Sequence, residues 1–167
     1  MAGAIICALN TRLDPNMLST LLEHSEAKIL FADHQLLHIA DEAVNLLKTD
    51  SKLPLVVVIS EPDSRSPSTL NGKYEYESLV EGGVTEYSII RPNDECDPIS
   101  LNYTSGTTSR PKGVVFSHRG GYLSSITSVF MREIQERPTY LWTLPNIRGF
   151  LGLHVVLSCS CFHLPSE

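Results

Sequence analysis

The fold is decided by Ile29-Leu-Phe-Ala32 and Leu55-Val-Val-Val-Ile59, two apolar runs on either side of a helical pattern. The second run is β-branched at its centre and has no polar alternation, which is typical of a parallel strand covered on both faces. Between the runs, Asp33 is placed to cap a helix whose apolar residues recur at helical spacing. These apolar residues are Leu36, Leu37, Ala40, Ala43, Val44 and Leu47.

Further strands and helices alternate on both sides of this unit. Asp14 and Pro15 are suited to the cap and first turn of a helix that turns Met17, Leu18, Leu21 and Leu22 to one face. A loop over 60–72 precedes a short helix over 73–81, which Gly82 and Gly83 stop. Later we expect strands at 99–103, 114–116 and 140–144, and a helix at 122–132 with Leu123, Ile126 and Phe130 inward. The pattern predicts an α/β fold with a mostly parallel sheet, right-handed crossovers and flanking helices.

Composition limits the class of protein. The chain has 167 residues, a net charge of −6 and 42% apolar residues, which suits about one globular domain and excludes a disordered chain. An acidic balance argues against a nucleic-acid binder, which needs clustered Lys and Arg. The cysteines are too few and scattered for a disulfide framework, so we expect a reducing, intracellular setting.

The two ends are unusual for a complete protein. The apolar run 2–9 predicts a buried strand or helix, and because its first basic residue, Arg12, follows the run, it is no secretory signal. We therefore expect Met1 to be an internal methionine of a longer ancestor. The apolar run 149–164 is too short for a membrane span, so no transmembrane segment is expected. It contains Cys159 and Cys161 with two histidines, but that spacing is not zinc-like, and an apolar tail is preferred to a metal site.

The segment from Thr104 to Gly113 carries the most chemical information. Hydroxyl residues and one glycine fill 104–109 after a predicted strand, and Lys112 precedes the next strand. Glycine lets successive backbone N–H groups converge on phosphate oxygens, and lysine supplies a mobile positive charge. No Asp or Glu occurs from Pro98 to Arg132. On composition alone a flexible Ser/Thr-rich surface loop remains the alternative, and the segment does not match the standard P-loop.

Thr104-Ser-Gly-Thr-Thr-Ser-Arg-Pro-Lys-Gly-Val-Val115 resembles the phosphate-binding signature of the AMP-forming acyl-CoA synthetase superfamily. Ser109 stands where the signature usually has glycine, a variation associated with the plant acyl-activating branch, which includes benzoate– and butyrate–CoA ligases. Shorter phrases such as Leu9-Asn-Thr-Arg12 and Phe116-Ser-His-Arg-Gly120 agree. The resemblance extends from Ala2 to Pro145.

The resemblance implies a fragment of the large N-terminal domain of an adenylate-forming enzyme. Members of the family activate a small-molecule carboxylic acid with ATP and transfer the acyl group to coenzyme A. The residues implied to wrap the β- and γ-phosphates, with Mg²⁺ sharing the charge, are Thr104, Ser105, Gly106, Thr107, Thr108 and Lys112. His118 is interpreted as a packing or capping residue. The resemblance gives no catalytic residue and no protein metal ligand on this chain.

The likeness stops near Asn146, which predicts a partial AMP-binding domain over 1–145 and a divergent tail over 146–167, from a frameshift or a retained intron. We expect the chain alone to be inactive as an enzyme. The alternative is a non-catalytic nucleotide-binding or interaction module that keeps the phosphate loop. The family is cytoplasmic or peroxisomal, although Leu164-Pro-Ser-Glu167 is not a peroxisomal signal. The acyl substrate is not given by these residues.

Overall fold

The computed structural model describes residues 3–47, 52–60, 73–84, 86–104 and 111–131. The chain divides into two compact units, one made of 1–10 with 89–167 and the other of 11–88. The strands are β1 (Ile6–Ala8), β2 (Ile29–Asp33), β3 (Leu55–Ile59), β4 (Tyr74–Glu75), β5 (Pro98–Thr104) and β6 (Lys112–Ser117). The helices are α1 (Pro15–Ser25), the 3₁₀ turn η1 (His34–Leu36), α2 (Leu37–Asn45), α3 (Tyr76–Glu81) and α4 (His118–Met131).

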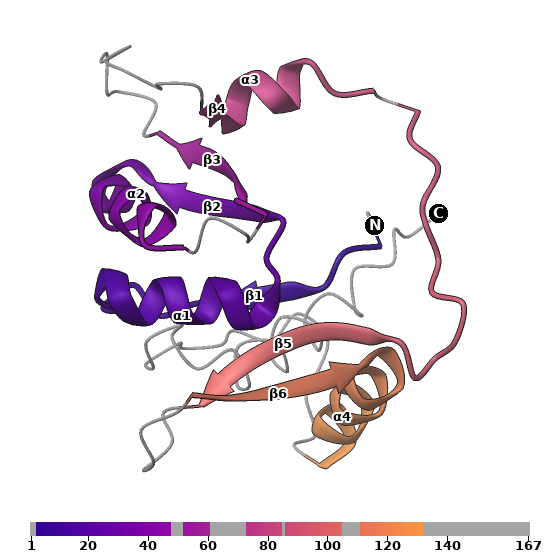
Figure 1. Cartoon of the computed structure of the whole chain (residues 1–167). Helices are drawn as coiled ribbons and strands as arrows, with labels where there is room; N and C mark the ends of the chain where they lie inside the picture. The colour runs from indigo at the N-terminus through magenta and orange to yellow at the C-terminus, as the bar shows by residue number, and fades with distance from the viewer. Residues whose placement is uncertain (1–2, 48–51, 61–72, 85, 105–110, 132–167) are drawn as a thin grey trace. The chain divides into compact units, whose positions relative to one another are not determined.

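The unit of residues 11–88 is built on a parallel sheet in the order β2-β3-β4 (Figure 1). β3 is the central strand, and Val56, Val57 and Val58 are all buried, so both faces of the strand are covered. This confirms the prediction from its unbroken apolar run. Since β2 and β3 pair from Ile29 with Leu55 to Asp33 with Ile59, the register also agrees with the two runs that decide the fold.

The helices of this unit start and pack as the sequence predicts. Asp14 accepts a hydrogen bond from the Met17 backbone N–H at 2.9 Å, and Pro15 is the first helical residue of α1. Asp33 caps η1 through the Gln35 N–H at 2.8 Å, and α2 follows directly. α1 and α2 pack against each other. Their buried residues are Leu18, Leu21, Leu22, Ala40 and Ala43.

The segment after Lys73 differs from the prediction of one continuous helix. Tyr74 and Glu75 form β4, which pairs in parallel with Val57 and Val58 of β3, and α3 begins only at Tyr76. The ring of Tyr76 meets Phe31 of β2 edge to face, with centroids 6.3 Å apart. A strand of two residues is too short to show a periodic pattern in the sequence. It forms because it pairs with β3.

The unit of residues 1–10 and 89–167 contains a second sheet in the order β1-β5-β6. β1 and β5 are parallel, whereas β5 and β6 form an antiparallel hairpin (Figure 1). The mostly parallel α/β class is confirmed, but the described strands form two small sheets. The apolar run 2–9 was predicted to be a buried strand or helix, and it contains the strand β1. The predicted burial is wrong, since Ile5 and Ile6 are 53% and 62% exposed.

Helix α4 packs against β5 and β6, and it differs most from the prediction. It begins at His118, earlier than the expected Tyr122. Its buried residues are Gly121 and Ser125, whereas Leu123 and Phe130 are 50% and 76% exposed, so their inward assignment is wrong. Because Gly121 and Ser125 are small, the helix can approach the sheet closely on their side. This close contact determines which face of α4 is buried, and the spacing of its apolar residues does not. The predicted strand at 140–144 and the tail over 149–164 lie outside the described residues, and so does the predicted loop over 60–72 except for Ser60.

Candidate phosphate-binding site

The hairpin of β5 and β6 brings together the two ends of the hydroxyl-rich segment. Thr104 is the last residue of β5, Lys112 is the first of β6, and the two are paired in register. The connecting segment therefore starts and ends at neighbouring points of one sheet edge. Of the residues predicted to bind phosphate, the structure describes the backbone of Thr104 and all of Lys112. Ser105, Gly106, Thr107 and Thr108 lie outside the described residues.

Gly113 is required by the packing of this hairpin. It is paired with Tyr103, and a Cβ built at Gly113 would lie 3.4 Å from Tyr103 Cε1 and 2.9 Å from Leu101 Cδ1. A side chain here would push against both neighbours on β5. Gly113, the glycine after Lys112, thus leaves room for the Leu101 and Tyr103 side chains next to the predicted phosphate-binding segment.

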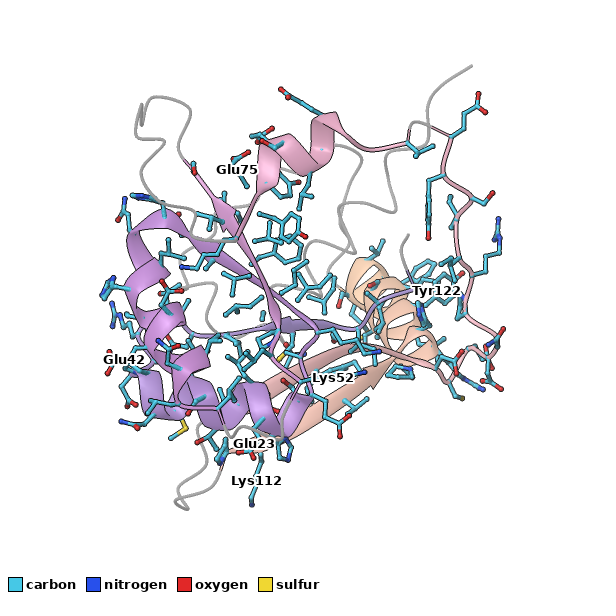
Figure 2. All side chains as sticks on the ribbon, turned by 45° about the horizontal axis from the view of Figure 1, so that its top comes forward. Glu23, Glu42, Lys52, Glu75, Lys112 and Tyr122 are labelled. Carbon is cyan, nitrogen blue, oxygen red and sulfur yellow. The ribbon has the colours of Figure 1, made fainter. Side chains whose placement is uncertain are left out.

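Lys112 supplies an available positive charge at the end of the hairpin. Its side chain is exposed and extends away from the ribbon (Figure 2). The other cation of the carboxylate-free segment that the structure describes is Arg119, whose Nη1 lies 2.8 Å from Glu95 Oε1. Within the described ranges, Lys112 has no ion pair. The hairpin therefore presents one exposed ammonium group that no described carboxylate neutralises.

The start of α4 is fixed by residues on both sides of the hairpin. His118 N–H donates to Asp97 O at 3.0 Å, and Arg119 N–H donates to Glu95 O at 2.8 Å. Ser117 Oγ accepts from the Gly120 N–H at 3.1 Å, as the residue at an N-cap does. The side-chain cap predicted as one role for His118 is thus supplied by Ser117. These contacts anchor the helix that follows β6.

Ser100 and Asn102 form a buried polar pair that the sequence reasoning missed. They are only 3% and 8% exposed, and Asn102 Nδ2 donates to Ser100 Oγ at 3.3 Å. The signal was available, because two polar residues alternate with apolar ones in the strand that leads into the loop. It was overlooked because a polar residue in such a strand is normally assigned to the solvent face.

The described residues contain no group of three or more His, Cys, Asp or Glu side chains able to hold a metal ion. Cys159 and Cys161, the weak metal candidates, lie outside the described ranges. Burial raises the pKa of the Cys7 thiol, and a hydrogen bond to Asp94 raises the pKa of the Cys96 thiol. A raised pKa keeps a thiol protonated, so neither group has the character of a nucleophile.

Residues 1–160 match the model of a family described as AMP-binding enzyme. The chain belongs to this family. It is 46% identical over 146 residues to probable acyl-activating enzyme 21 of Arabidopsis thaliana, covering 87% of this chain and 26% of that relative. It is 45% identical over 165 residues to the peroxisomal trans-cinnamate:CoA ligase of Petunia hybrida, covering 90% of this chain and 29% of that relative. This AMP-binding chain therefore spans less than a third of either relative.

A solved structure agrees with the family. The anthranilate CoA ligase AuaEII, in complex with anthranoyl-AMP, superposes with a TM-score of 0.63 at 27% identity, covering 74% of this chain and 22% of that one. The fold is thus that of a piece of an adenylate-forming enzyme, as the resemblance implies. Within the part of the AMP-binding chain that the structure describes, no helix has the length and apolar character needed to cross a membrane.

Proposed function

We propose that this chain carries the ATP phosphate-binding part of an acid–CoA ligase, with Thr104, Ser105, Gly106, Thr107, Thr108 and Lys112 around the β- and γ-phosphates. The observation that carries the proposal is the pairing of Thr104 with Lys112, which places an exposed cation at the mouth of a hydroxyl-rich connection. The absence of Asp and Glu from Pro98 to Arg132 supports it further, because a nearby carboxylate would repel phosphate.

The residues fit a magnesium-bound nucleotide. An ammonium group and small hydroxyls are the donors that phosphate oxygens accept from, and bound Mg²⁺ would share the remaining charge. In the proposed reaction a carboxylate oxygen of the acid attacks the α-phosphorus of ATP and pyrophosphate leaves. The thiol of coenzyme A then displaces AMP and forms the thioester. The role of Lys112 is to hold the departing pyrophosphate, and it transfers no proton.

The acid is proposed by analogy with named relatives. The petunia relative is named for trans-cinnamate, the superposed structure is named for anthranilate, and another relative, from Arabidopsis thaliana, is named for butyrate. An aromatic or fatty carboxylic acid is therefore the substrate class we propose. A cytoplasmic or peroxisomal site of action is proposed on the same grounds. We further propose that residues 1–145 are a partial AMP-binding domain and that 146–167 form a divergent tail. On this proposal the chain by itself binds nucleotide without completing the reaction.

Titration calorimetry of the full chain with MgATP tests the proposal. Lys112→Ala is expected to weaken binding, because it removes the described cation at the hairpin end. Lys52→Ala is the matched control, since Lys52 is also exposed but belongs to the other unit (Figure 2). Equal affinities for the unaltered chain and Lys112→Ala would overturn the phosphate site. Pyrophosphate release from MgATP and a carboxylic acid would overturn the expectation that the chain alone is inactive.

A further inference from the structure

One face of the sheet β2-β3-β4 carries exposed apolar side chains. Because register partners in a parallel sheet share a face and side chains alternate along each strand, Ile29 and Phe31 lie on the same face as their partners on β3. Tyr74 joins them, since it is in register with Val57. The exposed members of this apolar face have exposed fractions of 41–55%. They are Ile29, Phe31, Leu55, Ile59 and Tyr74.

An aromatic pair extends the apolar face from β2 to α3. Phe31 on β2 and Tyr76, which follows β4, lie on either side of β3, yet their ring centroids are 6.3 Å apart. The rings therefore meet across β3 at the level of Val57, which is in register with Phe31 and only 1% exposed. Tyr76, Leu79 and Val80 share one side of α3, as helical residues three and four apart do. All three are at least 38% exposed, so the apolar face continues onto α3.

The size of the apolar face is that of a protein interface. Its eight large side chains are each about half exposed, which leaves about 700 Å² of apolar surface at roughly 200 Å² per side chain. This area exceeds the largest apolar patch that most soluble monomers expose. Two copies in face-to-face contact would bury about 1,400 Å², within the range of stable interfaces.

The two ends of the strands under the apolar face differ in charge. Lys28 directly precedes β2 and Lys52 lies three residues before β3, and both side chains are exposed. At the opposite end, Asp33 is the last residue of β2 and Glu75 is the last of β4 (Lys52 and Glu75 are labelled in Figure 2). Glu26, the C-cap of α1, reduces the positive charge of the first end without cancelling it. Because the strands are parallel, cations gather at one edge of the apolar face and carboxylates at the other.

We propose that this apolar face is the interface between two copies of the chain. The copies are related by a two-fold axis that lies between the two sheets and runs across the strands, so the strands are antiparallel through the interface. The lysine end of each copy then lies against the carboxylate end of the other, and the apolar side chains pack between the sheets as in a β-sandwich. An axis along the strands would instead place lysine against lysine, which the charges disfavour. The interface lies within residues 11–88 and does not depend on the proposed phosphate site.

Sedimentation equilibrium of the full chain tests the interface. We expect a saturable monomer–dimer equilibrium with a dissociation constant in the micromolar range. Ile29→Glu and Ile29→Lys remove the same exposed apolar side chain but place opposite charges near Asp33 of the second copy. Both should weaken the dimer. The dissociation constant of Ile29→Glu should be about tenfold higher than that of Ile29→Lys, and this difference should shrink in high salt.

Phe130→Glu is the matched control. Phe130 is a 76% exposed apolar residue on α4 of the other unit, so its replacement should leave dimerisation unchanged. Circular dichroism checks that each variant folds. If the Ile29 variants do not fold, Leu55→Glu and Leu55→Lys replace them, because Leu55 is in register with Ile29 on the same face.

Each other outcome overturns the proposal. A chain that stays monomeric into the millimolar range does not use the face for self-association, and a monomer that sediments with phosphatidylcholine vesicles would assign the face to a lipid surface. Association that continues beyond the dimer would indicate head-to-tail contact. Equal dissociation constants for Ile29→Glu and Ile29→Lys would reject the antiparallel arrangement. Weakening by Phe130→Glu as strong as that by Ile29→Glu would show that the association is not specific to this face.

Discussion

Tyr103 lies across Gly113 on the neighbouring strand, at the register position next to the ends of the hydroxyl-rich segment. A Cβ at Gly113 would be 3.4 Å from Tyr103 Cε1 and closer still, at 2.9 Å, to Leu101 Cδ1. Both contacts come from β5, so the glycine is needed for close packing between the two strands of the hairpin. The Lys112-Gly113 pair thus combines the residue that we propose to bind phosphate with a residue that the packing of the hairpin requires.

Gly113→Val is expected to destabilise the chain by about 1–3 kcal/mol, since the added side chain overpacks the hairpin. Urea unfolding followed by circular dichroism measures the change. Gly113→Ala in a Leu101→Ala background gives the control, because removing the Leu101 methyl groups relieves the shorter contact. Additive effects of these two substitutions would show that the contact with Leu101 is not the cause.

Gly82→Ala is expected to have the opposite sign. Gly82 closes α3 with a φ of −78°, and its added Cβ would meet Ser78 O at an ordinary 3.4 Å. Replacing glycine at a compatible backbone position reduces the entropy of the unfolded chain and stabilises by about 0.4–1 kcal/mol. The same urea titration checks this value. A loss of stability would show that the end of α3 needs glycine for a reason other than backbone freedom.

The ion pair between Lys73 Nζ and Asp41 Oδ2 joins α2 to the residue before β4. The Lys73 side chain is 16% exposed and that of Asp41 is 40% exposed, so the two partners differ in burial. Asp41→Asn leaves a largely buried ammonium group without its charge partner and is expected to cost about 1–3 kcal/mol. Lys73→Met leaves a carboxylate that water can reach, and we expect a loss of no more than about 1 kcal/mol.

The matched control for this pair is Arg119 with Glu95, whose side chains are 57% and 65% exposed. Glu95→Gln keeps the backbone contact to Arg119 N–H and removes only the charge, so its effect on urea unfolding is expected to be smaller than that of Asp41→Asn. Equal losses at the two pairs would mean that burial does not determine their contributions.

Glu75 gives α3 a pH dependence of known sign. Its Oε2 accepts from the Ser78 backbone N–H at 2.7 Å, and this bond lowers the pKa of the carboxyl group (Figure 2). The stabilisation is therefore fully present above the unfolded pKa of about 4.3 and is lost as the pH falls through the lower folded pKa. Glu75→Gln keeps an acceptor without the charge. The stability difference between wild type and Glu75→Gln should shrink on acidification below that range, whereas a constant difference would contradict the assignment.

Local sequence signals predicted the parts of the fold whose cause is local. The cap at Asp14, the proline at the first position of α1 and the unbroken β-branched run of β3 act through neighbouring residues, and all are confirmed. The two-residue strand β4 and the antiparallel pairing of β5 with β6 were missed, because each depends on a partner distant in the chain. Hydrophobic spacing predicted the wrong buried face for α4, because the residues that are buried there are Gly121 and Ser125.

The candidate site could be located from its residue types but not fully characterised from them. Lys112 and Thr104 were identified by the hydroxyl-rich pattern and the resemblance, and the structure adds that they are paired. The alternation of Ser100 and Asn102 with apolar residues indicates that the two share one face of the strand, but it does not show that this face is buried, because the place of β5 between β1 and β6 depends on distant parts of the chain. The roles of the residues from Ser105 to Thr108 stay predictions.

Cys96 offers a test of the acidic turn that precedes β5. Its backbone N–H donates to Asp94 Oδ1 at 2.6 Å, and a hydrogen bond between its thiol and the Asp94 carboxyl group, together with that negative charge, raises the thiol pKa. Because the thiolate is the reactive form, this exposed cysteine is expected to react slowly with iodoacetamide at pH 8.

With Cys7, Cys159 and Cys161 replaced by serine, Asp94→Asn should speed the alkylation, since asparagine keeps an acceptor oxygen and removes the charge. The raised pKa predicts that the rate of the wild-type turn reaches that of Asp94→Asn only at higher pH. Identical pH–rate profiles for the two proteins would show that the Asp94 charge does not control the thiol.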